Sequence, residues 1–130
     1  MHTITRKFEI SNEDIDNLMV CALEGGINDW CCKAEMKKDP AGIGYDGVTL
    51  EDDEEVLYAS DIISKGGTLI LHDCESEDKW ELNLENFLKG VEKEMENSSF
   101  GTIEELMDGH DAYTADNIIQ FAIFGELTFC

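Results

Sequence analysis

The stretch from residue 68 to residue 97 constrains the fold most, because its hydrophobic period changes once, from two to about 3.6. Residues 68–73 and 79–83 are strand-like runs separated by five residues, which is a spacing typical of a β-hairpin. After Asn83, a suitable N-cap, apolar residues recur at the spacing of an amphipathic helix: Leu84, Phe87, Leu88, Val91 and Met95. A hairpin that leads directly into a helix favours an α+β fold.

The remaining segments predict further elements around this unit. In residues 28–38, Trp30, Cys32, Ala34 and Met36 alternate with polar residues and Cys31, so we expect a strand with Trp30 and Cys32 on one face. Other expected strands are 3–10 and 126–130, and other expected helices are about 12–24 after Ser11, 57–67, 103–107 and 115–125 after Thr114. The sequence therefore predicts one α+β domain over residues 1–130, with a mainly antiparallel sheet of about five strands and three to five helices packed on it.

Charge is the strongest functional signal in the chain. It has 30 acidic and 9 basic residues, which give a net charge of -21. Nucleic acids and anionic membranes bind basic surfaces, so direct binding to either is not expected, and a basic partner is favoured. Two interpretations of the charge stay open: a surface that keeps the protein soluble, or one that imitates the phosphate charge of a nucleic acid.

Two acidic segments are candidates for binding a basic partner. One is an acidic loop at about 39–55, and the other is the connection 74–78 in the hairpin. The candidate residues are Glu51, Asp52, Asp53, Glu54, Glu55, Glu75, Glu77 and Asp78. An EF-hand starting at Asp73 is excluded, because Asp78 and Leu84 stand where glycine and glutamate are required. Alternatively, both segments only provide solubility, and an apolar or mixed patch binds the partner.

The cysteines and histidines do not predict catalysis. The histidines are His2, His72 and His110, and each cysteine lies among acids that would raise its thiol pKa. Common nucleotide-binding and hydrolase motifs are missing from the sequence. We therefore expect that the protein is not an enzyme.

Zinc is the one cofactor that the sequence suggests. His72 and Cys74 are two residues apart, and Cys31 or Cys32 on a facing strand could join them, with His110 or Cys130 completing four ligands. The alternative is that Cys21 and Cys32 are small buried apolar residues and that His72 is a surface imidazole with its hydrogen bonds satisfied. The N-terminus lacks the apolar stretch of a signal peptide, so we expect a cytoplasmic protein. In that compartment an odd count of five cysteines favours free thiols over disulfides.

Three segments resemble a family of small acidic proteins carried by phages and prophages of Gram-positive bacteria: residues 21–31 (CALEGGINDWC), 59–91 (ASDIISKGGTLILHDCESEDKWELNLENFLKGV) and 116–129 (DNIIQFAIFGELTF). Among such proteins the chain is similar to type II-A anti-CRISPR proteins. The resemblance implies a stoichiometric inhibitor of host Cas9 in the bacterial cytoplasm. Cas9 holds nucleic acid in positively charged channels. The alternatives are a zinc-binding structural or regulatory phage protein with no CRISPR role, and a nucleotide-sequestering protein or enzyme.

Overall fold

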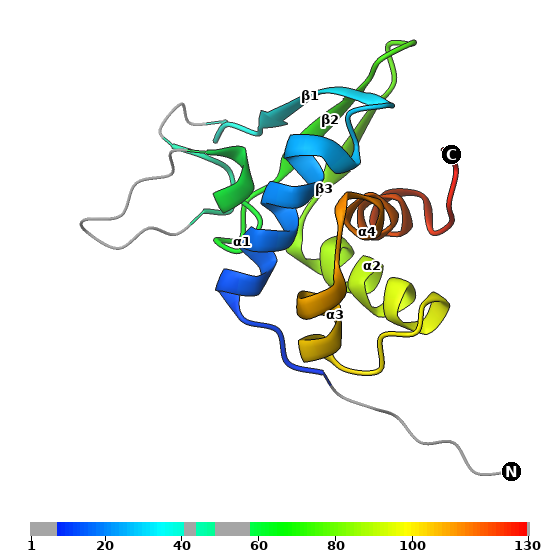
Figure 1. Cartoon of the computed structure of the whole chain (residues 1–130). Helices are drawn as coiled ribbons and strands as arrows, with labels where there is room; N and C mark the ends of the chain where they lie inside the picture. The colour runs from blue at the N-terminus through cyan, green and yellow to red at the C-terminus, as the bar shows by residue number, and fades with distance from the viewer. Residues whose placement is uncertain (1–7, 41–43, 49–57, 130) are drawn as a thin grey trace, which may run out of the picture.

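A computed structural model describes residues 8–40, 44–48 and 58–129 (Figure 1). Helix α1 leads through a π-helical segment to strand β1, and a short 3-10 turn precedes the hairpin of β2 and β3. Three helices then complete the chain. The bounds are α1 Asn12–Cys21, the π-helix Ala22–Gly26, β1 Cys31–Met36, the 3-10 turn Ala59–Asp61, β2 Leu69–Asp73, β3 Lys79–Leu82, α2 Leu84–Asn97, α3 Ile103–Gly109 and α4 Ala112–Phe124.

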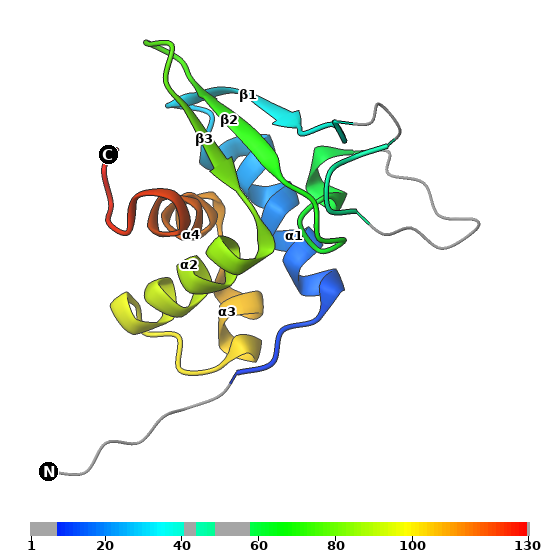
Figure 2. The same cartoon turned by 180° about the vertical axis from the view of Figure 1, so that it is seen from behind.

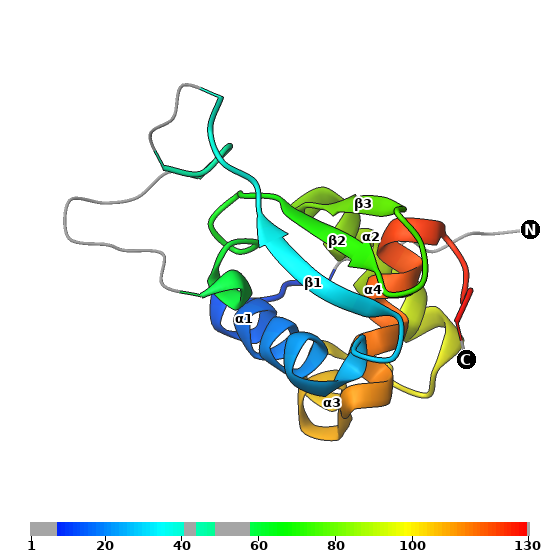
Figure 3. The same cartoon turned by 90° about the horizontal axis from the view of Figure 1, so that it is seen from above.

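The sheet is antiparallel with the order β1-β2-β3. Leu71 of β2 lies between Ala34 of β1 and Trp80 of β3, so the predicted hairpin is confirmed. Helices α1, α2 and α4 lie on one face of this sheet (Figures 1 and 3). Leu69 and Leu71 point to that face and are fully buried, as their alternation with Ile70 predicts. The α+β class and the antiparallel pairing are therefore confirmed.

The expectation of about five strands is wrong for the described part of the chain, which contains three. Residues 8–10 and 126–129 are not in strands, while residues 3–7 and 130 lie outside the described residues. A short segment that alternates apolar and polar residues is predicted as a strand from its pattern alone. It forms one only if a neighbouring strand pairs with its backbone.

A buried glutamine takes the place of a partner strand for residues 126–129. Gln120 is 1% exposed. Its Oε1 accepts the backbone N–H groups of Thr128, at 2.8 Å, and of Phe129, at 2.7 Å. Its Nε2 donates to the carbonyl oxygen of Phe129 at 3.1 Å. The ring of Phe129 is thereby stacked on Trp30 with 5.1 Å between centroids. One side-chain amide thus fixes the C-terminal segment against the core.

A β-bulge at the start of β1 corrects the predicted pattern of that strand. The register shifts between Cys31 and Lys33, so the regular alternation of faces is interrupted at Cys32. Trp30 and Cys31 are both buried, at 3% and 6% exposed, and Cys32 is exposed. The prediction that Trp30 and Cys32 share a face is therefore wrong, because strict alternation does not hold through a bulge.

Helix ends follow local capping chemistry. Ser11 Oγ accepts the N–H of Asp14 at 3.1 Å, and Asn83 Oδ1 accepts the N–H of Asn86 at 2.9 Å, so both predicted N-caps are confirmed. Helix α4 begins earlier than predicted, because Asp111 rather than Thr114 is its N-cap. It ends at Gly125, which has the left-handed φ of 74° expected of a helix stop.

Helix boundaries elsewhere differ from the sequence pattern. The α-helical part of α1 ends at Cys21, and the chain continues as a π-helix to Gly26, where a longer α-helix to about residue 24 was expected. In the expected helix at 57–67, the described residues 58–67 are helical only at Ala59–Asp61, as a 3-10 turn. Within the described ranges, no helix is long and apolar enough to cross a membrane.

Helices α2 and α4 pack against each other at Gly90. A methyl group at this position would collide with the carbonyl oxygen of Ile118 and approach the Cβ of Ala122 to 3.0 Å. Glycine inside a helix costs about 1 kcal/mol relative to alanine, but here it permits the close approach of the two helices. The core between the helices and the sheet includes Leu18, Met19, Ile62, Ile63, Leu69, Leu71, Leu82, Phe87, Leu106, Ile118 and Ile119.

Candidate functional site

The connection between β2 and β3, residues 74–78, extends beyond the helices as the end of the hairpin (Figures 1 and 2). We call residues 73–78 the hairpin tip. Its backbone is held at both ends, because the N–H of Asp73 donates to the carbonyl of Asp78 and the N–H of Cys74 donates to the carbonyl of Trp30, each at 3.0 Å. The tip therefore has a defined conformation.

Side chains within the tip add further hydrogen bonds. Ser76 Oγ donates to Asp73 Oδ2 at 2.6 Å and accepts the N–H of Asp78 at 3.1 Å. The N–H of Glu75 donates to Asp73 Oδ1 at 3.4 Å. Such local bonds from Asp and Ser side chains to a nearby backbone stabilise turns. The carboxylate of Asp73 is consequently used in building the turn, whereas in the described structure the carboxylates of Glu75, Glu77 and Asp78 are not.

Three predicted partner-binding residues, Glu75, Glu77 and Asp78, lie together on this tip, and all three are exposed. In the described part of the chain, none of their carboxylates pairs with a lysine. The acid Glu81 on β3, by contrast, does pair with a lysine: its Oε1 lies 2.9 Å from Lys37 Nζ. That hydrogen bond raises the pKa of Lys37. The tip therefore presents uncompensated negative charge, the arrangement that attracts a basic surface. The other five, Glu51 to Glu55, lie outside the described residues.

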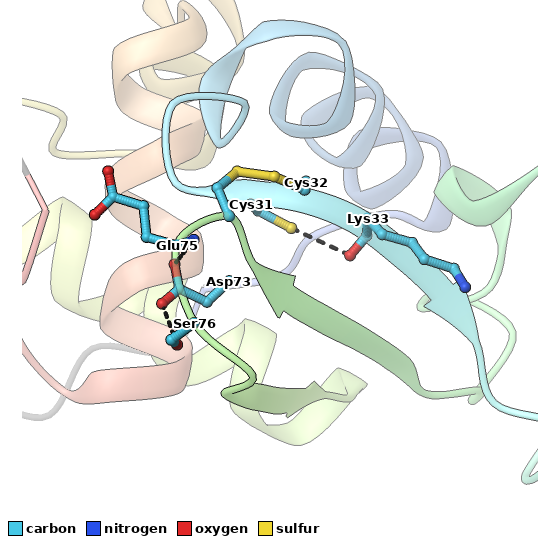
Figure 4. The surroundings of a disulfide bond; sticks show 7 residues. Cys31, Cys32, Lys33, Asp73, Glu75 and Ser76 are labelled. Carbon is cyan, nitrogen blue, oxygen red and sulfur yellow. Dashed lines mark hydrogen bonds between the residues drawn. A yellow bond between two sulfur atoms is a disulfide. The ribbon is translucent and has the colours of Figure 1, made fainter.

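A disulfide between Cys32 and Cys74 ties the tip to β1 (Figure 4). Their Cα atoms are 4.9 Å apart, which is within the range that a disulfide requires. The expectation of free thiols is therefore wrong for these two residues. The bulge turns Cys32 away from the core, and the antiparallel pairing of β1 and β2 brings Cys74 beside it. Residue count and compartment could not reveal this geometry.

The four predicted zinc ligands are not all placed for one ion. Cys32 and Cys74 are bonded to each other, while Cys31 is buried and its Sγ hydrogen bonds to the carbonyl of Lys33 at 3.3 Å. Burial raises the pKa of the Cys31 thiol, which disfavours a thiolate ligand. His72 Nε2 lies 3.3 Å from Glu35 Oε1. Among the described residues, no group of three or more His, Cys, Asp or Glu side chains is arranged to hold a metal ion.

The other suggested ligands do not complete such a group. His110 is the C-cap of α3, and its Nδ1 lies 2.8 Å from the carbonyl of Met107. Cys130 lies outside the described residues.

The sequence reasoning missed one buried titratable residue. Glu94 of α2 is only 4% exposed, and its Oε2 has no hydrogen-bond partner in the described structure. Burial raises its pKa, the side-chain hydrogen bond from Asn117 opposes this, and the charge of Asp111 raises it further. The signal was present in the sequence, because residue 94 is three positions after Val91 and seven after Phe87, on the buried face of the helix.

Comparisons of the chain with protein-family models, with curated proteins and with solved structures found no match. Any proposal of function therefore depends on the hairpin tip, the charge and the sequence resemblance.

Proposed function

We propose that this chain is a phage-encoded anti-CRISPR protein that binds host Cas9 through an acidic surface and inhibits the loading or cleavage of target DNA. The hairpin tip is the feature that carries the proposal. Glu75, Glu77 and Asp78 are exposed without lysine partners in the described structure, on a turn that hydrogen bonds of Ser76 hold in place. A partner with a positively charged nucleic-acid channel, such as Cas9, is complementary to this surface.

The inhibition is stoichiometric rather than catalytic. Acidic side chains on the tip, together with Glu51 to Glu55, occupy basic positions of Cas9 that would otherwise contact the phosphates of DNA. A rigid tip loses little conformational freedom on binding, which favours affinity. Because its negative charges repel phosphates, the protein competes with DNA and does not form a ternary complex at the same surface.

A plasmid-cleavage assay with purified Cas9 and guide RNA tests this function. The protein is added either before or after the target DNA. We expect inhibition when the protein is added first and much weaker inhibition when DNA is already bound. Equal inhibition in both orders would contradict blockade of DNA loading, and no inhibition of several Cas9 orthologues would overturn the proposal.

Zinc analysis of the same sample addresses the alternative function. Stoichiometric zinc together with no effect on Cas9 would favour a zinc-binding structural or regulatory phage protein with no CRISPR role. In that case zinc should compete with the Cys32–Cys74 disulfide, because both require the same sulfur atoms. Counting free thiols before and after metal removal distinguishes the two states.

A further inference from the structure

We propose that a groove between residues 8–10, α2 and α3 binds a basic amphipathic segment of a partner protein. The groove has a volume of about 360 Å³, and its apolar lining consists of Phe8, Ile10, Leu88, Val91, Met95 and Ile103. Helix α3, which contributes Ile103 to the groove, lies at the opposite end of the molecule from the hairpin tip (Figure 1). The inference therefore goes beyond the proposed function and does not depend on it.

The apolar floor of the groove includes three residues of the α2 stripe, Leu88, Val91 and Met95. Val91 and Met95 are buried, at 4% and 7% exposed. Leu88, which shares their stripe, is 39% exposed, and Phe8 on the other side of the groove is 41% exposed. Both side chains thus offer apolar surface to a ligand. The volume is near the lower end of the range for ligand pockets, about 300–1,000 Å³, and suits a few apolar side chains of a peptide.

Among the described residues that line this region, the charged ones are all acidic. A second hollow adjoins the groove and shares Phe8, Ile10 and Ile103 with it. The charged residues that line the two hollows are Glu9, Asp14, Glu92 and Glu104, with no lysine or arginine among the described lining residues.

The lysines of α2 do not neutralise these acids, because they are directed to other partners. Lys89 Nζ lies 3.5 Å from Glu85 Oε1, and Lys93 Nζ donates to the carbonyl of Gly125 at 3.4 Å. With respect to the described residues, the acids around the groove therefore retain their attraction for a cationic ligand.

An apolar floor with an acidic rim is complementary to a helix that has leucine-like residues on one face and lysine or arginine beside them. The apolar face enters the groove at the i, i+3, i+4 spacing, and the long basic side chains reach the carboxylates at the rim. A second copy of this chain is a poor occupant, because each copy carries a net charge of -21. An anionic membrane is repelled for the same reason.

Fluorescence polarisation with a designed probe tests the inference. The probe is a fluorescein-labelled peptide of leucine and lysine with leucines at i, i+3, i+4 and i+7, and the control peptide has the same composition in scrambled order. Full-length protein is titrated into each. We expect about tenfold tighter binding of the patterned peptide, because only its leucines can enter the groove together. Equal affinity for both peptides would overturn the inference, since non-specific charge attraction would explain the binding.

Matched variants locate the peptide on the protein. The double variant Phe8→Ser/Leu88→Ser should weaken binding about tenfold, because both side chains are partly exposed and lose contact area. Leu127→Ser, which alters a side chain 41% exposed outside the groove, should have no effect. Circular dichroism confirms that each variant is folded. An equal loss in Leu127→Ser would contradict binding in the groove.

Charge variants give a second test that does not depend on packing. Glu92→Gln/Glu104→Gln should weaken binding about fivefold and reduce its salt dependence. Glu75→Gln/Glu77→Gln removes the same charge at the hairpin tip and should change affinity less than twofold, since only net charge is altered there. Equal effects of the two pairs would contradict a local role of the rim.

Occupation of the groove by residues 1–7 of this chain, which include Arg6 and Lys7, is the remaining outcome. It would be recognised if the patterned peptide bound only to the Arg6→Gln/Lys7→Gln variant. That result would overturn the inference of a partner segment.

Discussion

Replacing Glu94 by glutamine should stabilise the protein at neutral pH. The side chain of Glu94 is 4% exposed between α2 and α4, and in the described part of the chain only one of its two oxygens has a hydrogen-bond partner, the amide of Asn117. Glutamine retains an acceptor for that amide and removes the charge. In the natural chain, the pKa of Glu94 is raised above the ordinary value of 4.5, first by burial and then by the charge of Asp111. Ionisation of Glu94 in the folded state is therefore unfavourable.

The magnitude follows from the unpartnered oxygen. A buried polar atom without a hydrogen bond costs about 1–3 kcal/mol, and more when it is charged. The neutral amide of glutamine and the protonated carboxyl both carry the smaller cost, so only the ionised carboxylate carries the excess. We therefore expect Glu94→Gln to increase the free energy of unfolding by about 1 kcal/mol at pH 7. In a domain of this size, that corresponds to a rise in Tm of roughly 4 °C.

The raised pKa of Glu94 determines how the gain in unfolding free energy should change with pH. A carboxyl whose pKa is raised by folding contributes stability below its unfolded pKa and loses that contribution as pH rises through its folded pKa. The difference in unfolding free energy between Glu94→Gln and the natural chain should therefore be near zero at about pH 4 and positive at pH 7. Taking a difference cancels the opposite contribution of Asp111, whose pKa is lowered by hydrogen bonds from Thr114.

Urea unfolding of both proteins from about pH 4 to pH 8 measures this difference. Glu96→Gln, an exposed position on the same helix, is the matched control and should show no such trend. A difference for Glu94→Gln that does not change with pH would refute the assignment of the cost to ionisation. Lower stability of Glu94→Gln at pH 7 would refute the reasoning about the buried charge.

Three further predictions concern the fold. Gly90→Ala should lower the free energy of unfolding, measured in urea, by about 1–3 kcal/mol, because the added methyl group collides with α4. The control Gly101→Ala, where the added methyl meets no atom nearer than 3.9 Å, should change it little. Equal effects of the two variants would contradict the close contact between the helices. Reduction of the Cys32–Cys74 bond, which spans 42 residues, should lower stability by up to about 4 kcal/mol, and an unchanged thiol count on reduction would contradict the pairing. Gln120→Leu should destabilise by about 1–3 kcal/mol and shift tryptophan emission to the red; a chain with unchanged emission would show that Gln120 does not hold the C-terminal segment.

Local chemistry was predictable from the sequence where neighbouring residues determine it. Asn83 caps α2 because a side chain three residues before an N–H suffices for the bond, and the stripe from Leu84 to Met95 specifies which face is buried. Gly125 ends α4 because glycine tolerates a positive φ. These features need no knowledge of the rest of the fold.

Features set by distant residues were not predictable in the same way. The bulge at Cys31, and hence the exposure of Cys32, depends on the register against β2. Residues 126–129 alternate like a strand, but their backbone bonds are made by the side chain of Gln120. The acids of the hairpin tip were identified from their sequence position, whereas their lack of lysine partners depends on the positions of lysines elsewhere in the described structure.

The most direct test of the proposed function is the affinity of purified Cas9, loaded with guide RNA, for charge-reversal variants. Glu77→Lys/Asp78→Lys reverses two exposed charges on the hairpin tip, and Glu96→Lys/Asp108→Lys reverses two exposed charges on α2 and α3. We predict that the tip variant binds at least about tenfold more weakly than the control variant, because it replaces attraction by repulsion at the contact. Equal affinity of the two variants would contradict the claim that the acidic hairpin tip binds Cas9.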